Sequence, residues 1–475
     1  MLFRSSADAA AVETVNVCVI MVQFSDNLMS ANQAGTPAAF DSILFSDRTI
    51  DTAGAIINPT GSMTDYYREV SYGNFFVTGT IYGPYTAPNT YAYYVGGDDG
   101  LSRSPELVRW LVDTYDPQIN FQNHSRNGYT CDGLVIIHAG RGAEEGVYGI
   151  WSHKYTIGNT LKDGVTISNY TMNPEESGSS SLSPIGVFCH EYGHFLGLPD
   201  LYDIQYNDGS NGAGMWSLMA TGNYPVGSKR PAHLDAWCKA QVGFVTVIDV
   251  PATNLRQAAI PAIQWNPVVY RLRNATTTAS NEYFLVENRQ KTGFDLNLPG
   301  AGLCIWHFDN GAPSAGGSNI YPPYRIAMEQ ADGAFQLEYG LNNTGDAGDP
   351  FPGATNNRNF HYYTWPGANL NNTNTPQDGA NPQGIAVWNI SNSDSIMYAD
   401  LDVSYSRPYI VPAPPISGSG FFFNDDAPRG DGDGMPEAGE TIHFYCWIQN
   451  AMRPSYNVRA TLTSSTSGIN FTVPT

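Results

Sequence analysis

Positive charge is scarce in this sequence. It has 23 Lys and Arg against 44 Asp and Glu, which gives a net charge of −21 at pH 7. An acidic surface repels nucleic-acid phosphates and anionic lipid headgroups, so we expect neither as a partner. The acidic excess favours solubility, and it can also supply the oxygen ligands that calcium prefers.

Cysteine is scarce as well. The 475 residues contain 6 cysteines, and no two of them form C-x-x-C, which argues against a thiol-rich zinc site and a thioredoxin motif. Cys18, Cys131, Cys189 and Cys304 lie within apolar runs. This placement predicts buried thiols rather than a disulfide framework.

Long hydrophobic runs and targeting patterns are missing. No stretch of about 18 apolar residues occurs, so the sequence predicts no membrane-spanning helix. The first residues lack a signal-peptide pattern, and the pattern of a core strand begins as early as Asn16. We expect an exported protein from which a signal and a pro-segment have been removed, with a cytosolic protein as the alternative.

The strongest motif that is present is H-E-x-x-H, at His190, Glu191 and His194. On a helix, the i, i+4 spacing puts both imidazoles on one face, one turn apart, where they can chelate a single zinc ion. Gly197 and Asp200 extend the motif to H-E-x-x-H-x-x-G-x-x-D. A turn at Gly197 would bring Asp200 to the same metal, whereas a chance match would leave both histidines as ordinary core residues.

The residues around this motif predict a helix. Ser183 can act as its N-cap, Pro184 suits the first helical position, and Gly197 and Pro199 end it. Apolar residues repeat at helical spacing on the side opposite the two histidines. These residues are Ile185, Phe188, Cys189, Tyr192, Phe195 and Leu196.

Two acidic segments are candidate calcium sites, and a solvated, charged loop is the alternative for each. The first is the loop Leu201–Gly214, and the second precedes the last predicted strands. The candidate ligands of the first are Asp203, Asn207, Asp208 and Asn211. Those of the second are Asp425, Asp426, Asp431, Asp433 and Glu437.

Hydrophobic periodicity predicts the remaining elements. Strands are expected at Val15–Phe24, Phe75–Tyr82, Asp132–Ala139, Ile150–Ile157, Tyr283–Asn288, Gly302–Phe308 and Ile385–Ile390. Helices are expected at Ser62–Val70, Pro105–Tyr115 and Pro231–Gly243.

Several motifs in chain order resemble those of one family. They are V-Q-F-S-D at Val22–Asp26, G-S-M-T-D-Y-Y-R-E-V-S-Y-G at Gly61–Gly73, D-G-L-V-I-I-H-A-G at Asp132–Gly140, I-W-S-H at Ile150–His153, H-E-Y-G-H-F-L-G-L-P-D-L-Y-D at His190–Asp203, W-S-L-M at Trp216–Met219, F-L-V-E-N-R-Q at Phe284–Gln290 and G-D-P-F-P-G at Gly348–Gly353. The stretch from Val15 to Val403 therefore resembles the secreted bacterial metallopeptidases of the immune-inhibitor-A type.

The resemblance implies a metzincin-like zincin, with a mixed sheet, an active-site helix and a methionine turn under the metal. It implies zinc ligands at His190 and His194, Glu191 as general base and Met219 in the methionine turn.

The third zinc ligand departs from the histidine that is common in metzincins. We expect Asp200 in this role, with Asp203 as the rival, because a carboxylate oxygen is a sound zinc ligand.

A change to short strands and turns from about Val245, and a Pro/Gly/Ser-rich stretch after Val403, indicate a division of the chain within an α+β fold class. The expected units are a zincin catalytic domain at 1–248, a β-rich domain packed on it at 249–403, a Pro/Gly/Ser linker at 404–420 and an Ig-like β-sandwich at 421–475. The last unit is short for a sandwich, so we expect it to be incomplete.

The implied function is a secreted, monomeric zinc endopeptidase that acts on proteins or peptides. Glu191 would take a proton from a zinc-activated water molecule. The substrate would pair in extended form with the edge strand Ile150–Ile157. Tyr224 and His153 are weak candidates for stabilising the oxyanion.

Two other functions are alternatives. The first is a non-catalytic, calcium-stabilised surface or adhesion protein that retains the zincin fold. The second is a zinc hydrolase that acts on non-peptide substrates. Intact His190, Glu191 and His194 argue against the first, because a protein without activity has no need of the base.

Overall fold

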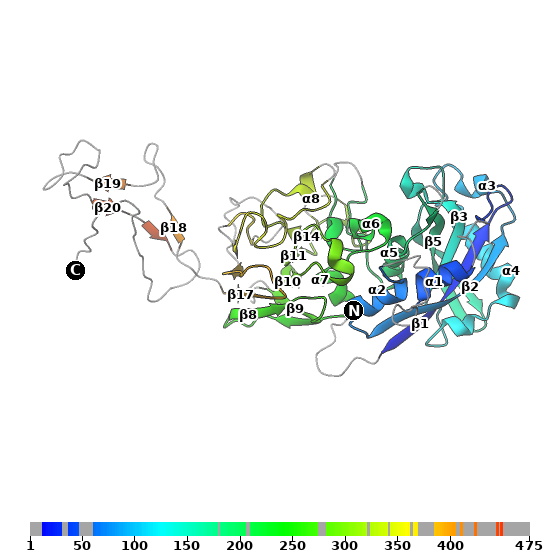
Figure 1. The fold of residues 1–475 in the computed structure, drawn as a ribbon, viewed down its shortest axis with the longest axis horizontal. Coiled ribbons are helices and arrows are strands. Elements are labelled where there is room, and N and C mark those ends of the chain that lie inside the picture. The colour runs from blue at the N-terminus through cyan, green and yellow to red at the C-terminus, as the bar shows by residue number, and fades with distance from the viewer. Residues whose placement is uncertain are drawn as a thin grey trace.

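The computed structural model describes residues 12–404, apart from 31–36, 47–59, 179–180, 206–209, 274–281, 321–323, 341–342, 362–363 and 369–383. Beyond residue 404, it describes four short strands that form two antiparallel pairs (Figure 1). The pairs are β18 (Tyr409–Val411) with β21 (Trp447–Gln449), and β19 (Phe422–Asn424) with β20 (His443–Tyr445). Most of the expected linker and sandwich lies outside the described residues.

A six-stranded mixed sheet forms the first part of the chain, with strand order β2-β1-β3-β5-β4 and β6 beside β5. β1 is parallel to β2 and β3, β3 is parallel to β5, and β4 is antiparallel to β5. The strands are β1 (Glu13–Gln23), β2 (Phe75–Thr86), β3 (Leu134–Arg141), β4 (His153–Lys162), β5 (Val165–Ser177) and β6 (Ser181–Leu182).

Few helices accompany this sheet, and their ends follow the local sequence. α2 begins after Ser62, close to where the sequence predicts, and Ser62 and Asp65 form a capping box there. α4 buries Leu107, Val108 and Leu111. The helices are α1 (Pro37–Phe45), α2 (Met63–Val70), α3 (Tyr91–Val95), α4 (Ser104–Tyr115), α5 (Ile185–Phe195), α6 (Pro225–Ser228), α7 (Ala236–Val242) and α8 (Gln336–Tyr339).

The second part of the chain is β-rich. A five-stranded sheet has the order β14-β11-β10-β9-β7, and a four-stranded sheet has the order β15-β16-β17-β8. The strands are β7 (Thr246–Asp249), β8 (Leu255–Pro261), β9 (Val268–Leu272), β10 (Tyr283–Arg289), β11 (Gly302–Phe308), β14 (Ile326–Glu329), β15 (Asn359–His361), β16 (Ala386–Trp388) and β17 (Ile396–Asp402). A small hairpin joins β12 (Ser314–Ala315) to β13 (Ser318–Asn319). The whole is a mixed α+β protein, as the sequence predicts.

The five-stranded sheet contributes to two hydrophobic cores because its side chains alternate between its faces. Leu285 and Trp306 belong to the core shared with the first sheet, whereas Val286 and Ile305 belong to the core shared with the four-stranded sheet. All seven residues of β10 are buried. The β-rich part therefore completes the hydrophobic core of the first part.

Buried charges also join the two parts. The Arg289 guanidinium forms ion pairs with Asp295 (2.6 Å) and Glu287 (3.3 Å), and all three side chains are fully buried. Arg289 Nη1 also donates to the carbonyl oxygen of Trp216 (3.0 Å). A buried, paired charge of this kind fixes the geometry of the groups around it, because leaving any member unpaired is costly.

Three predicted elements begin later than the sequence indicates. Ser183 is not the N-cap of α5: its N–H donates to Glu175 O (2.9 Å), so the helix begins after Pro184. β4 is an edge strand as predicted, but it begins at His153, because the preceding Trp151 N–H donates to Asp99 O (2.9 Å).

The helix predicted at Pro231–Gly243 begins at Ala236. Asp235 caps it by accepting a hydrogen bond from Cys238 N (2.9 Å), and His233 upstream is held by Asp295, which accepts from its N–H. The predicted end is confirmed, because Gly243 takes a left-handed conformation with φ 77°.

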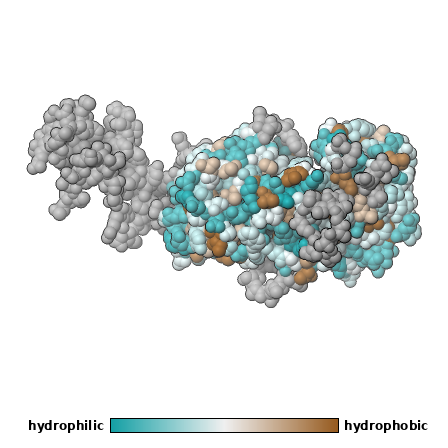
Figure 2. All heavy atoms as spheres, viewed as in Figure 1, coloured by the Kyte–Doolittle hydropathy of each residue, from teal (hydrophilic) through white to brown (hydrophobic). Residues whose placement is uncertain are grey.

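The five cysteines within the described residues, Cys18, Cys131, Cys189, Cys238 and Cys304, are free, and all but Cys131 are buried. Within those residues, the structure contains no helix long and apolar enough to cross a bilayer. Figure 2 shows hydrophilic residues over most of the viewed face, with hydrophobic residues in small scattered groups.

Candidate metal centre

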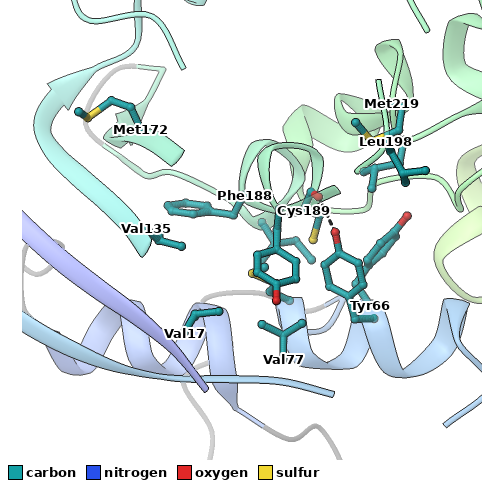
Figure 3. Close-up of a cluster of buried hydrophobic side chains, with 14 of the residues drawn as sticks. Val17, Tyr66, Val77, Val135, Met172, Phe188, Cys189, Leu198 and Met219 are labelled. Atoms are coloured by element: carbon teal, nitrogen blue, oxygen red, sulfur yellow. Dashed lines mark hydrogen bonds between the residues drawn. The ribbon is translucent and has the colours of Figure 1, made fainter. Parts of the chain in front are cut away.

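Helix α5 is anchored in the core by its apolar face. Phe188 and Cys189 lie among residues of the first sheet, including Val17, Val77 and Val135 (Figure 3). The carbonyl oxygen of Cys189 accepts a hydrogen bond from Tyr67 Oη (2.7 Å). The predicted stripe is thus buried at Ile185, Phe188, Cys189 and Tyr192, and half-buried at Phe195 and Leu196.

The opposite face of α5 brings the predicted metal ligands together. His190 Nε2 lies 3.1 Å from Asp200 Oδ1, and His194 Nε2 lies 3.2 Å from the same oxygen. A tetrahedral zinc site with bonds of about 2.0–2.1 Å places its ligand atoms about 3.3 Å apart. Two imidazole nitrogens and a carboxylate oxygen at these separations fit zinc in both donor type and spacing.

Backbone carbonyls orient both imidazoles. His190 Nδ1 lies 2.9 Å from Leu218 O, and His194 Nδ1 lies 2.7 Å from Leu198 O. When Nδ1 donates to a carbonyl oxygen, Nε2 is left with its lone pair for a metal. The rings are held nearly perpendicular to each other, with an interplanar angle of 88°.

Asp200 reaches the histidines because the chain turns sharply after α5. Gly197 has φ +88°, a left-handed conformation that favours glycine. The hairpin β12–β13 of the β-rich part then holds the backbone of Asp200. Its N–H donates to Ser318 Oγ (3.1 Å), and its carbonyl accepts from Asn319 N (3.1 Å).

Glu191 lies on the same helix between the two histidines and is 5% exposed. Its Oε2 is buried and has no hydrogen-bond partner within the described part of the chain. Burial raises the pKa of Glu191 to about 7, although the charges of His194 and His190 oppose the shift. A carboxylate with a pKa near neutrality and a free oxygen is suited to proton transfer.

His194 and Asp200 shift each other's pKa values in opposite directions. Burial would lower the pKa of His194, but the hydrogen bond with Asp200 and its charge raise this pKa to about 9. Burial would raise the pKa of Asp200, but hydrogen bonds from His190 and His194 lower it well below its usual range. Protons and a metal ion therefore compete for the same lone pairs.

Met219, the predicted methionine-turn residue, lies against α5. A Cβ added to Gly193 would lie 2.5 Å from Met219 Sδ, so the helix passes close to this side chain. Figure 3 shows Met219 beside Leu198. The Met219 backbone joins the ligand loop, since its carbonyl accepts from Leu201 N (2.7 Å).

The remaining predicted site residues are not brought into this cluster. Asp203 is 2% exposed, and its carboxylate accepts from Gln205 N (2.7 Å) and Ser210 Oγ (2.9 Å). Both ring nitrogens of His153 are engaged, Nδ1 by Trp151 O (2.6 Å) and Nε2 by Tyr170 Oη (3.1 Å). The Tyr224 side chain is largely exposed. The candidate calcium ligands Asn207, Asp208, Asp425, Asp426, Asp431, Asp433 and Glu437 lie outside the described residues.

Sequence reasoning missed several residues around the centre. Glu144 lies near enough to raise the pKa of Glu191, and it is held by the Ser152 hydroxyl (2.6 Å). Ser318 and Asn319 support the ligand loop from a distant hairpin. No sequence pattern near Asp200 indicates Ser318 or Asn319, because both are far from it along the chain. Glu144 could have been noticed, because it is one of two glutamates in a glycine-rich loop before the motif.

Two imidazoles and a carboxylate oxygen beside a buried glutamate are the side chains that metal centres of the H-E-x-x-H class use. Residues 106–244 match the family model described as immune inhibitor A peptidase M6, catalytic domain. The resemblance predicted from the motifs is confirmed for this stretch, which carries the catalytic-domain signature of a metallopeptidase family.

Two curated relatives are each similar to part of this chain. The pre-pro-metalloprotease PrtV of Vibrio cholerae serotype O1 is 32% identical over 246 residues, which cover 43% of this chain and 26% of the relative. Immune inhibitor A of Bacillus thuringiensis subsp. alesti is 31% identical over 199 residues, which cover 34% of this chain and 28% of the relative. The matched region thus spans little more than a quarter of either relative.

Among solved structures, OgpA from Akkermansia muciniphila covers 59% of this chain and 73% of its own. The sequence identity is 12% and the TM-score is 0.29. This likeness is too slight to bear on the fold.

Proposed function

We propose that the protein is a secreted zinc-dependent endopeptidase that hydrolyses peptide bonds of proteins. The observation that carries the proposal is the convergence of His190, His194 and Asp200 beside a buried, unpartnered oxygen of Glu191. The family match and the two relatives support the metallopeptidase class. Secretion rests on the resemblance to a secreted family.

His190, His194 and Asp200 would hold the ion, with Asp203 as the rival of Asp200. Zinc, when bound, supplies Lewis acidity that makes water a stronger acid and polarises a carbonyl group. Glu191 takes a proton from the attacking water and returns it to the leaving amine. A pKa of about 7 suits both transfers near neutral pH.

The edge strand β4 offers a place for the substrate. Among the described residues, no strand pairs with its outer side, and Tyr155 on it is 55% exposed. An extended peptide can pair with such an edge through its backbone, which suits protein substrates of varied sequence.

The finer architecture belongs to the same proposal. We propose a metzincin-like catalytic domain at 1–248, with Met219 in its methionine turn, and a β-rich domain at 249–403. A linker at 404–420 and an Ig-like sandwich at 421–475 would follow, and the protein would act as a monomer. Calcium at the predicted acidic loops remains a prediction.

The direct test is Glu191→Gln, with Glu106→Gln on the exposed surface of α4 as the matched control. Glu191→Gln should keep one zinc per chain and lose casein cleavage by about 100-fold or more, because amide nitrogen and oxygen cannot take the proton. Glu106→Gln should cleave casein at the wild-type rate.

Full casein cleavage by Glu191→Gln would overturn the mechanism. A wild-type protein that binds zinc without cleaving casein or a peptide library would instead favour the non-catalytic alternative. Cleavage of esters or amides but not of peptides would favour a zinc hydrolase of another class.

A further inference from the structure

A second group of potential metal ligands lies in the β-rich part, away from the candidate zinc centre. Carboxylate oxygens of Asp332, Asp346 and Asp349 lie within 4.8 Å of one another. Asp332 follows β14, and the other two belong to the loop before β15. Asp349 is 1% exposed, so this is not a group of freely solvated surface carboxylates.

One oxygen at this site lacks any partner within the described chain. Asp349 Oδ2 accepts hydrogen bonds from Trp216 Nε1 (2.9 Å) and Asp346 N (2.8 Å), whereas Oδ1 is buried and accepts none. An unsatisfied buried carboxylate oxygen is costly, and a cation or an ordered water is the usual remedy.

No basic side chain among the described residues forms an ion pair with any of the three aspartates. Burial raises the pKa of Asp349 to about 7, and the charges of Asp346 and Asp332 add to the shift. Three neighbouring carboxylates without a protein cation are therefore electrostatically uncompensated.

The loop is shaped closely around the carboxylates. Asp346 Oδ1 accepts from Gly348 N (2.7 Å), and Asp332 Oδ1 accepts from Ala334 N (2.9 Å). A Cβ at Gly348 would lie 2.5 Å from Asp332 Oδ2 and 2.9 Å from Asp346 Oδ1. A side chain at position 348 would therefore displace one of these carboxylates.

We propose that Asp332, Asp346 and Asp349 bind a calcium ion. The donors are all carboxylate oxygens, which favour a hard cation over zinc or copper. Calcium also tolerates irregular geometry and completes its six to eight ligands with carbonyl oxygens and water, whereas magnesium demands a near-ideal octahedron.

The ion would stabilise the junction between the two parts of the chain. Asp349 holds the Trp216 indole, and Met215 N donates to Thr344 O (2.7 Å) in the same loop. Trp216 lies three residues before Met219, beneath the candidate zinc helix. Binding at the three aspartates therefore fixes the segment that supports the zinc ligands, without contacting zinc.

Terbium, which replaces calcium at oxygen sites and emits when a nearby indole is excited, provides the test. The zinc-saturated full chain is titrated with terbium and then with calcium, and bound calcium is counted by equilibrium dialysis. We expect terbium emission that calcium displaces. Asp346→Asn should bind one calcium fewer per chain, whereas Asp41→Asn on the exposed face of α1 should match the wild type.

Asp332→Asn, at a partly exposed position, is the second variant should Asp346→Asn fail to fold. It should also bind one calcium ion fewer per chain. Calcium should raise the thermal unfolding midpoint of the wild type by about a few degrees, and this increase should be absent from the variant. Wild-type calcium stoichiometry in both folded variants would overturn the proposal, as would displacement of terbium by magnesium at concentrations where calcium has no effect. Because the readout is calcium stoichiometry, failure here leaves the zinc endopeptidase proposal untouched.

Discussion

Asp200 is the residue at which the metal centre departs from a three-histidine pattern. Its spacing after Gly197 predicted a place near the histidines, and the structure puts Oδ1 3.1–3.2 Å from both Nε2 atoms. Asp203, in contrast, has both carboxylate oxygens occupied by Gln205 and Ser210. The geometry thus favours Asp200 as the third ligand.

Substitution distinguishes the two aspartates. Asp200→Ala should weaken zinc binding by at least about 100-fold, because a direct ligand is lost and outer-shell changes alone cost about 10–100-fold. Asp203→Asn should lower the thermal unfolding midpoint but retain zinc. Competition with a fluorescent zinc chelator measures both affinities, and the reverse ranking would make Asp203 the ligand.

His307 is a buried titratable residue that makes the stability of the folded state depend on pH. It lies between Glu282 (2.9 Å from Nε2) and Glu329 (3.2 Å from Nδ1). Burial would lower the pKa of His307, but the two carboxylates raise it to about 9. A raised histidine pKa stabilises the folded state fully below the unfolded pKa of about 6.5, and this stability is lost as pH rises through 9.

We therefore expect His307 to contribute a fall on the order of 3 kcal/mol to the unfolding free energy of the zinc-saturated protein between pH 6.5 and 9.5. His307→Gln should lack this component of the pH dependence. Urea unfolding at several pH values measures it, and parallel curves for the two proteins would refute the assignment.

At the scale of the element, α5 fits its surroundings so closely that one methyl group matters. A Cβ at Gly186 would lie 2.0 Å from Asn223 O and 2.9 Å from Ser228 O, which are backbone atoms. Gly186→Ala should therefore destabilise the fold by about 3 kcal/mol through overpacking. The nearest atoms to a Cβ at Gly193 on the same helix belong to the side chains of Met219 and Leu198, which can move, so Gly193→Ala should cost less.

Chemical denaturation of the two variants tests this prediction. On an exposed helix, alanine stabilises relative to glycine by about 0.5–1 kcal/mol. A gain of that size for Gly186→Ala would mean that α5 does not pack against the segment 223–228.

The elements themselves were largely predictable from local patterns. Apolar runs predicted β1, β3 and β11, and the turn residues Gly197 and Gly243 predicted two helix ends. The starts of α5, β4 and α7 were misplaced because hydrogen bonds to distant carbonyl and carboxylate groups decide them. Glu175, Asp99 and Asp295 are such partners, and none is marked by a neighbouring sequence pattern.

At the scale of the whole molecule, residues of the β-rich part support the candidate metal centre, as the first sheet does. Ser318 and Asn319 hold the Asp200 backbone, and Arg289 holds Trp216 O. The sequence predicted packing between these parts but not which residues join them. Contacts between residues that are far apart in the chain produce no repeating pattern in the sequence. The group Asp332, Asp346 and Asp349 was missed for the same reason.

We expect residues 1–248 alone to lack a cooperative fold, because Tyr283, Leu285, Trp306 and Met328 complete the first core. Each such large side chain contributes about 2–5 kcal/mol, and the four together are comparable to the whole stability of a typical domain, about 5–15 kcal/mol. Residues 1–404 should unfold cooperatively, because they contain the described residues of both hydrophobic cores. Calorimetry of both fragments measures whether each unfolds cooperatively. A sharp thermal unfolding transition for residues 1–248 alone would contradict this account.

The central claim is that one zinc ion at His190, His194 and Asp200 supports peptide hydrolysis. The most direct test is to remove zinc with a chelator and to follow casein cleavage while zinc is returned in known amounts. The account predicts no cleavage without zinc, a linear rise and a break at one zinc per chain. Cleavage that survives complete zinc removal, or that fails to return with one equivalent, would contradict it.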